Sequence, residues 1–434
     1  MRSYYDLISH EGNRSLFTAI ELSIASQVNR IPLHFHVEGL RGTGKTTIIR
    51  AARHILPPIL RIKNCCYNCR PEAPHCPEHK GLSPEEIIRL GTELVPRPFL
   101  EISHSAKIGT VVGSIDLGKI IDSRHSVAAL LPGTVPRAHR GIIFIDEINR
   151  LADTSPELVD VLLDMMGTKP GRVQIEETGL PTVELPVTAS IWAASNPDED
   201  PGPLQQIRKQ LSDRFDLRVQ MERPLQSQTV RRILMQPRQK DILGVKSREL
   251  AVSDMKNVVF PSDILDVLAA IYIDFEIESI RAVEALELSA TLLALRNGRK
   301  TVTLDDVADV VPLVFGHRLD PVTIERIQQY VKRLALQNGW EADTADHPGN
   351  PVMAERSKEK NSWLKRLWQS ACKKFSNGNG SPASSGKTRE QGEGQSLEGP
   401  SARPAAIEMV APPKQAIPLE QLPSDQLVSV DSEP

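Results

Sequence analysis

The chain has 434 residues, a formal net charge of −3 and only 4% aromatic residues. This length suits two or three domains, since a domain usually holds about 100 to 200 residues. The near-neutral charge and the scarcity of aromatic residues argue against a dedicated nucleic-acid binder. No apolar run approaches the roughly 20 residues that a membrane-spanning helix needs, and the first residues lack the apolar core of a signal peptide. We therefore expect a cytoplasmic protein.

The first elements lead into a glycine-rich loop. Residues 16–28 place apolar side chains at helical spacing, and residues 32–37 predict a short buried strand. Residues 39–46 then match the pattern G-x-x-x-x-G-K-[ST]. In such a loop the backbone N–H groups surround phosphates, the lysine pairs with the terminal phosphates and the hydroxyl residue binds Mg²⁺. The residues expected to bind ATP here are Gly39, Gly42, Thr43, Gly44, Lys45, Thr46 and Thr47.

A cysteine-rich insert at residues 64–80 follows. Its two donor pairs are Cys66 with Cys69 and Cys76 with His79. Two such pairs are typical of a closed, structural Zn²⁺ site, whose metal would supply folding energy to a loop with few apolar residues. Cys65 and His75 are spare donors, so the ligand set stays open. A four-cysteine iron–sulfur site and thiols without metal are the alternatives.

Strands and helices alternate beyond this insert. We expect strands at residues 98–102, 141–145 and 188–195, and helices near residues 122–131 and over residues 156–166. The strand at residues 141–145 is continuously apolar, as strands inside a parallel sheet are. The alternation predicts an α/β fold, with a parallel sheet covered by helices on both faces.

Polar residues follow two of these strands. Asp146 is expected to bind Mg²⁺ together with Thr46, and Glu147 to orient and polarise an attacking water. Both acids fall at the carboxyl end of a strand, where ligands bind in open α/β sheets. Asn196 ends the next strand and could hydrogen-bond the water or the γ-phosphate, with a simple turn as the alternative for an isolated Asn-Pro. This pattern predicts a nucleoside triphosphatase.

The carboxyl-terminal half divides into two regions. Helical spacing dominates from residue 224, and Thr303 with Asp306 forms a capping box before a helix that begins at Leu304. We expect an α/β nucleotide-binding domain at residues 1–223 and an all-helical lid domain at residues 224–341.

The remaining residues, 342–434, have the composition of a mostly disordered tail. Within this tail, residues 356–376 place tryptophan, leucine and phenylalanine at helical spacing among lysine and arginine residues. This pattern is typical of a helix that lies on an anionic membrane surface or docks on a partner. The alternative is a terminal helix that packs on its own domain.

Two arginines are candidates to neutralise charge on the γ-phosphate: Arg214, in the run SDRF, and Arg281. Taken alone, an arginine in such a position is more often a surface residue.

In this order, the residues resemble the AAA+ ATPases of the magnesium chelatase I-subunit family. The matching runs are VVGSIDL at 111–117, RAHRG at 137–141 leading into FIDEINRL, SNP at 195–197 and QLSDRFDL at 210–217. The resemblance spans residues 13–319. It implies a sensor-1 role for Asn196, a trans-acting arginine finger at Arg214 and a sensor-2 role for Arg281. It also implies an interface position for Arg208. Asp216 stands where the family usually has glycine.

The resemblance also implies an assembly. By this resemblance, we expect the chain to form a homo-oligomeric ring, a hexamer, with ATP and Mg²⁺ bound between neighbouring subunits. ATP hydrolysis would drive insertion of a metal into a tetrapyrrole held by a large partner subunit, with a second partner that carries an integrin-like domain. Two alternatives stay open: a MoxR-like chaperone ATPase that matures a metalloprotein, and a nucleotide-dependent scaffold with little turnover.

Overall fold

The computed structural model of the chain describes residues 3–115, 130–175, 182–235 and 255–337. All of them fall within one unit of the fold, Met1–Thr344. The predictions for the tail at residues 342–434, with its basic segment 356–376, lie outside the described residues.

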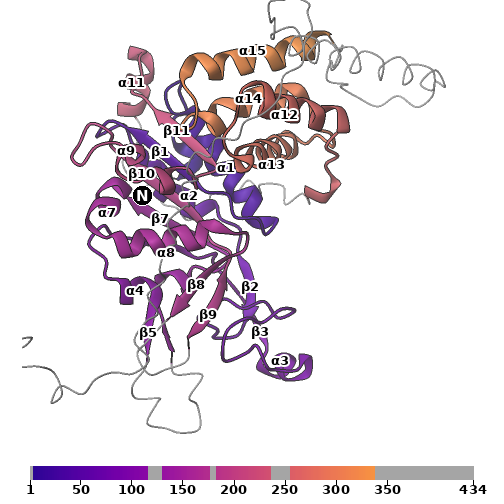
Figure 1. Ribbon diagram of the computed structural model, residues 1–434. Coiled ribbons are helices and arrows are strands. Elements are labelled where there is room, and N and C mark those ends of the chain that lie inside the picture. Colours follow the sequence, from indigo (N-terminus) through magenta and orange to yellow (C-terminus); the bar gives the residue numbers. More distant parts are fainter. Residues whose placement is uncertain (1–2, 116–129, 176–181, 236–254, 338–434) are drawn as a thin grey trace, which may run out of the picture. The chain divides into compact units, whose positions relative to one another are not determined.

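Five parallel strands form the central sheet, in the order β11–β1–β10–β7–β4 (Figure 1). The strands are β1 Phe35–Gly39, β4 Phe99–Ile102, β7 Ile142–Asp146, β10 Ser190–Ser195 and β11 Leu217–Met221. Every residue of β1 and β10 is buried, because both strands have neighbours on either side and helices on either face. The predicted parallel sheet is confirmed, although β1 begins three residues later than expected.

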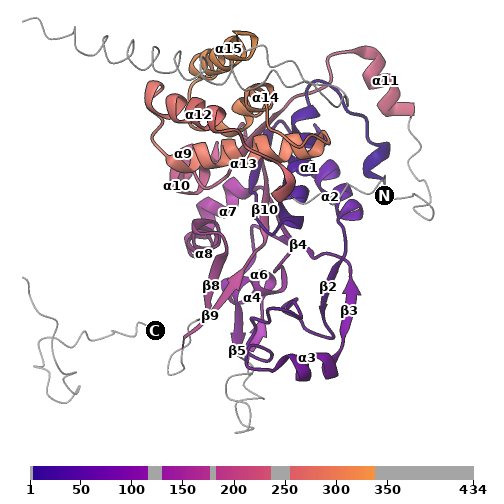
Figure 2. The same cartoon turned by 90° about the vertical axis from the view of Figure 1, so that its right-hand side faces the viewer.

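Helices cover both faces of this sheet, and Figure 2 shows the sheet between them. On one face lie α1 Arg14–Val28 and α2 Lys45–Ala52, and on the other α7 Ile148–Thr154 and α8 Pro156–Gly167. The side chains of β7 alternate between the faces: Ile143 and Ile145 join the apolar core shared with α7 and α8. Trp192 of β10 points to the other face, where its Nε1 donates to Ser23 Oγ of α1 at 2.8 Å.

Three antiparallel strand pairs, none of them predicted, lie outside the central sheet. They pair β2 Ile59–Ile62 with β3 Thr92–Val95, β5 Gly113–Ile115 with β6 Leu130–Pro132, and β8 Gly171–Ile175 with β9 Val183–Val187. The helix expected near residues 122–131 lies mostly outside the described residues, and its end is wrong because Leu130 and Leu131 pair with β5. Short helices connect these elements: α3 Pro84–Leu90, α4 Ile108–Val112, α6 Thr134–Arg137, α9 Leu204–Ile207 and α10 Lys209–Ser212.

The last described elements are helical, as the sequence predicts. They are α11 Ser227–Met235, α12 Ser262–Asp274, α13 Ile280–Arg296, α14 Leu304–Phe315 and α15 Pro321–Gln337. Single 3-10 turns lie at Met255–Asn257, before α12, and earlier in the chain at Tyr4–Asp6 and Arg53–Ile55. The capping box is confirmed: Thr303 Oγ1 accepts the Asp306 N–H, and the Asp306 carboxylate accepts the Thr303 N–H at 3.0 Å. The exact boundary between sheet domain and lid, residue 223, stays a prediction.

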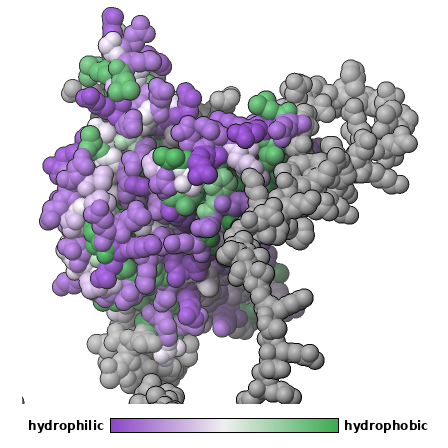
Figure 3. All heavy atoms as spheres, turned by 45° about the horizontal axis from the view of Figure 1, so that its top comes forward, coloured by the Kyte–Doolittle hydropathy of each residue, from purple (hydrophilic) through white to green (hydrophobic). Residues whose placement is uncertain are grey.

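The described surface in Figure 3 is mainly hydrophilic, and its hydrophobic residues form small separate groups. None of the described helices is long and apolar enough to cross a membrane.

Candidate functional site

The glycine-rich loop connects the end of β1 to the start of α2. Gly42 and Gly44 take φ values of +79° and +95°, which residues with a side chain rarely adopt. A Cβ atom at Gly42 would meet nothing within 4 Å, so the space above the loop is open. The loop therefore presents its backbone and the amino end of α2 to a ligand, as a phosphate-binding loop does.

Lys45 follows the loop, and its side chain turns back over it. Nζ donates to the backbone oxygens of Gly39 and, at 2.9 Å, of Leu40. Burial lowers the pKa of Lys45, while the carboxylates of Asp146 and Glu199 oppose this effect. The ammonium group thus lies against the loop, within the electrostatic reach of two acids.

Thr46 and Asp146 meet at the carboxyl edge of the sheet, although a hundred residues separate them in the chain. Thr46 Oγ1 donates to Asp146 Oδ2 at 3.1 Å. A hydroxyl and a carboxylate at this spacing are the oxygen ligands that Mg²⁺ takes in phosphate-loop enzymes. The residues present therefore fit the nucleotide-bound Mg²⁺ that the sequence predicts.

Glu147 lies beside this pair, at the beginning of α7. Its backbone is left-handed, with φ +55°, and its carboxylate forms an ion pair with Arg150 at 3.2 Å. Arg150 also lies 3.6 Å from Glu199, which forms a second ion pair of 2.9 Å with Arg41 of the phosphate loop. The sequence did not predict this network of charged residues. The spacing of Glu147 and Arg150 on one helix is a signal for their pair, whereas Glu199 follows a strand in a loop without any pattern.

Asn196 follows β10, next to the strand that carries Asp146. Its Oδ1 accepts the N–H of Asp198 at 3.3 Å, and its backbone oxygen accepts Asn149 Nδ2 of α7 at 3.3 Å. The sequence-predicted residues Lys45, Thr46, Asp146, Glu147 and Asn196 thus gather at one edge of the sheet, at the carboxyl ends of β1, β7 and β10.

Arg214 lies at the opposite side of the sheet, where the parallel strands begin. Leu217 of β11 pairs in parallel with Phe35, and Met221 pairs with Gly39, so residues before β11 lie at the amino end of β1. The phosphate loop follows the carboxyl end of β1, five residues and roughly 16 Å away. Arg214 is therefore not placed to reach the phosphate loop of its own subunit.

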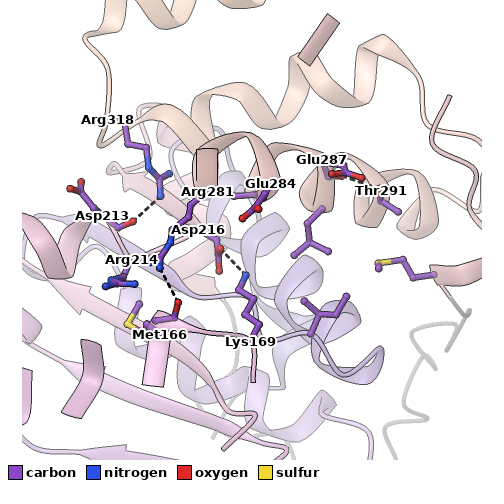
Figure 4. Close-up of a pocket in the computed structure, with 15 residues that line it drawn as sticks. Met166, Lys169, Asp213, Arg214, Asp216, Arg281, Glu284, Glu287, Thr291 and Arg318 are labelled. Atoms are coloured by element: carbon purple, nitrogen blue, oxygen red, sulfur yellow. Dashed lines mark hydrogen bonds and ion pairs between the residues drawn. The ribbon is translucent and has the colours of Figure 1, made fainter. Parts of the chain in front are cut away.

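Arg281, near the start of α13, extends into the same pocket as Arg214, of about 420 Å³ (Figure 4). Arg281 Nη2 donates to the backbone oxygen of Gly167 at 2.9 Å. Arg214 Nη1 is buried and has no hydrogen-bond partner among the described residues. Burial and, next, the positive charge of Arg281 lower the pKa of Arg214. No phosphate-loop residue lines this pocket.

The loop that carries Arg214 is held from two sides. Arg318, between α14 and α15, donates to the backbone oxygens of Asp213 at 3.0 Å and Phe215 at 2.8 Å. Asp216 accepts the N–H of His34 at 2.8 Å and the Lys169 ammonium at 2.9 Å. The aspartate that departs from the family pattern thus has a structural role.

Arg208, the other arginine that the resemblance singled out, lies between α9 and α10. Its Nε donates to the backbone oxygen of Ala152 in α7 at 3.5 Å. This contact joins the helix that starts at Glu147 to the segment before Arg214, and its role at a subunit interface stays a prediction.

In the cysteine-rich insert, Cys65 takes the place among the clustered donors that we expected for Cys66. Cys66 is exposed and lies outside the donor cluster, whereas Cys65 is buried within it. The donor atoms that lie within 4.8 Å of one another belong to Cys65, Cys69, Cys76 and His79. A four-cysteine iron–sulfur site would need Cys66, which lies outside this cluster.

Comparison with known proteins decides the family. Residues 6–203 match the family model described as magnesium chelatase, subunit ChlI, and residues 265–333 match that of the AAA lid domain. The magnesium-chelatase 38 kDa subunit of Acidiphilium rubrum is 33% identical over 304 residues, which cover 65% of this chain and 83% of that protein. The chain belongs to the magnesium chelatase ChlI family.

Other relatives extend the ChlI match. The 38 kDa subunit of Chlorobaculum tepidum is 30% identical over 331 residues, 71% of this chain and 80% of that protein. The ChlI homolog of Methanocaldococcus jannaschii is 28% identical, over 70% and 84% of the two chains. A solved structure, described as a complex between subunits BchI and BchD of magnesium chelatase, matches 74% of this chain at 26% identity with a TM-score of 0.41. ChlI-family membership makes the sheet and lid those of an AAA+ ATPase.

Proposed function

We propose that this ChlI-family protein hydrolyses ATP at the site formed by Lys45, Thr46 and Asp146. The observation that carries the proposal is the 3.1 Å contact of Thr46 Oγ1 with Asp146 Oδ2, beside the loop that ends in Lys45. Membership in an AAA+ family supports ATP as the nucleotide and Mg²⁺ as its metal.

In the proposed phosphoryl transfer, each residue of the site has its own role. Mg²⁺-bound ATP supplies the phosphoryl group and its leaving group. The loop N–H groups would bind phosphate oxygens. The Lys45 ammonium would then donate to these oxygens instead of to the backbone oxygens of Gly39 and Leu40. Thr46 and Asp146 would hold the Mg²⁺ ion. Glu147 would orient the attacking water with its carboxylate, which also pairs with Arg150.

The two arginines of the distant pocket complete a neighbour's site in this proposal. Arg214 lies roughly 16 Å of strand away from its own phosphate loop, and its buried Nη1 has no hydrogen-bond partner in the described part of the chain. An arginine supplied in trans can raise the rate of phosphoryl transfer by ~10³ to 10⁵. Hydrolysis would then require a ring in which Arg214 and Arg281 face the next subunit's nucleotide. We propose a hexamer.

ATP turnover in this ring would drive insertion of a metal into a tetrapyrrole. Support comes from relatives named as magnesium-chelatase subunits, of which the chain covers 83% in one case and 80% in another. The proposal includes a partner with an integrin-like domain and a large tetrapyrrole-binding partner. A MoxR-like chaperone would share the ATPase and differ in its client.

A single substitution tests the ATPase. Glu147→Gln should lower turnover at least roughly 100-fold, because the amide cannot accept a proton from water, while ATP binding persists. Glu157→Gln, the same change at an exposed position of α8, is the matched control and should leave turnover unchanged. Full turnover in Glu147→Gln would contradict the assignment. Negligible turnover in the assembled wild-type protein would favour the scaffold.

A further inference from the structure

We propose that Cys65, Cys69, Cys76 and His79 bind one Zn²⁺ ion, and that this ion holds the insert between β2 and α3 against the residues that lead into β7. The site lies apart from the nucleotide site. Its existence does not depend on ATP hydrolysis.

The four side chains already lie at the spacing of a tetrahedral site. The three cysteines are 0% exposed and His79 is 8% exposed. Cys65 Sγ lies 4.0 Å from Cys76 Sγ, and Cys76 Sγ lies 3.0 Å from His79 Nδ1. Two sulfurs bound tetrahedrally at about 2.3 Å from Zn²⁺ are about 3.8 Å apart. The metal therefore needs no rearrangement of the backbone.

The surroundings of Cys69 suit a thiolate. Its Sγ accepts the backbone N–H groups of His75 and Cys76, both at 3.3 Å, and lies 3.3 Å from His75 Nδ1. Donors of this kind surround metal-bound sulfur and compensate its negative charge. His75 itself stacks on His139, with ring centroids 4.0 Å apart, and is not among the clustered donors.

Three thiols and one imidazole specify the metal and its role. Soft sulfur ligands in a tetrahedral set select zinc over magnesium or calcium. Because the protein supplies all four ligands, no position remains for water or substrate, and the site is structural.

The insert fixed by this metal is bound to the base of β7. Asn68 Nδ2 donates to the backbone oxygen of Arg137 at 2.7 Å, and Arg140 Nη1 donates to the backbone oxygen of Asn68 at 3.3 Å. Arg140 stands two residues before β7, the strand that ends in Asp146. Zinc would thus hold together a polar segment that anchors the strand of the nucleotide site.

Metal analysis of the purified full-length protein tests the proposal. Wild type and Cys66→Ser should each carry about one zinc per chain, and Cys65→Ser should carry at least several-fold less. These two cysteines are adjacent, so the pair is matched in chemistry and position. Equal zinc loss in both variants, or no zinc uptake by the wild-type protein, would overturn the proposal.

Cobalt substitution keeps the test independent of variants that fail to fold. Wild-type protein loaded with Co²⁺ in place of its zinc should show intense tetrahedral ligand-field bands and a sulfur-to-metal charge-transfer band. A weak octahedral spectrum without charge transfer would overturn the proposal. Nucleotide binding at Lys45 is a separate measurement, so either result leaves the ATPase proposal to its own test.

Discussion

Asp216 offers a quantitative test of how the arginine pocket is built. Its side chain is only 11% exposed and accepts two hydrogen bonds, from the His34 N–H at 2.8 Å and from Lys169 Nζ at 2.9 Å. The first bond fixes the start of β11 beside the start of β1, two residues from Arg214. We predict that Asp216→Ala destabilises the protein, and that Asp216→Asn does so much less.

The magnitude follows from the two contacts. Removal of the carboxylate leaves the fully buried His34 N–H without its acceptor, which costs about 1 to 3 kcal/mol. The ion pair with Lys169 adds up to about 1 kcal/mol, because that lysine is 34% exposed and can find water. Asp216→Ala should therefore lower the free energy of unfolding by about 1 to 4 kcal/mol. Asp216→Asn keeps an acceptor for His34 and should lose about 1 kcal/mol.

Denaturant unfolding followed by circular dichroism measures both variants against wild type. Asp153→Ala, at an exposed position of α7, is the control and should change stability by less than about 0.5 kcal/mol. Equal stability of Asp216→Ala and wild type, or equal losses in the two Asp216 variants, would refute the role given to the His34 contact.

Two further predictions concern assembly and pH. A mixture of Arg214→Ala and Lys45→Ala subunits, each inactive alone, should regain part of the turnover, because an intact nucleotide site can then meet an intact arginine of its neighbour; no recovery would argue against catalysis in trans. Burial lowers the pKa of His34 and His36 from 6.5 to about 4, so the unfolded chain binds protons first as the solution is acidified. As the pH falls from 6.5 to about 4, the free energy of unfolding should therefore decrease by roughly 1.4 kcal/mol per pH unit for each histidine. An unfolding midpoint unchanged between about pH 7 and pH 5 would contradict this effect.

Local patterns in the sequence predicted which residues meet at the carboxyl edge of the sheet. The glycine-rich loop, the apolar strand before Asp146 and the capping box at Thr303 each depend on neighbouring residues in the chain, so the sequence alone contains their signals. Parallel pairing then brings Thr46 to Asp146, because the carboxyl ends of adjacent strands share one edge of the sheet.

Contacts between distant segments could not be predicted in this way. Leu130 and Leu131 are apolar and fit a helix or a strand, and only their pairing with β5 decides for the strand. The choice between Cys65 and Cys66 depends on a turn in which Asn64 and Asn68 take left-handed conformations, with φ of +62° and +54°. No spacing rule distinguishes two adjacent cysteines.

Titration of Mg²⁺-bound ATP into the folded protein, followed by calorimetry, tests the central claim most directly. We predict that wild type binds about one nucleotide per chain. Lys45→Ala should bind roughly 10- to 100-fold more weakly, because it lacks a charged hydrogen-bond donor to the phosphates. Folded wild-type protein that takes up no nucleotide, or a Lys45→Ala variant that binds as tightly as wild type, would contradict the account.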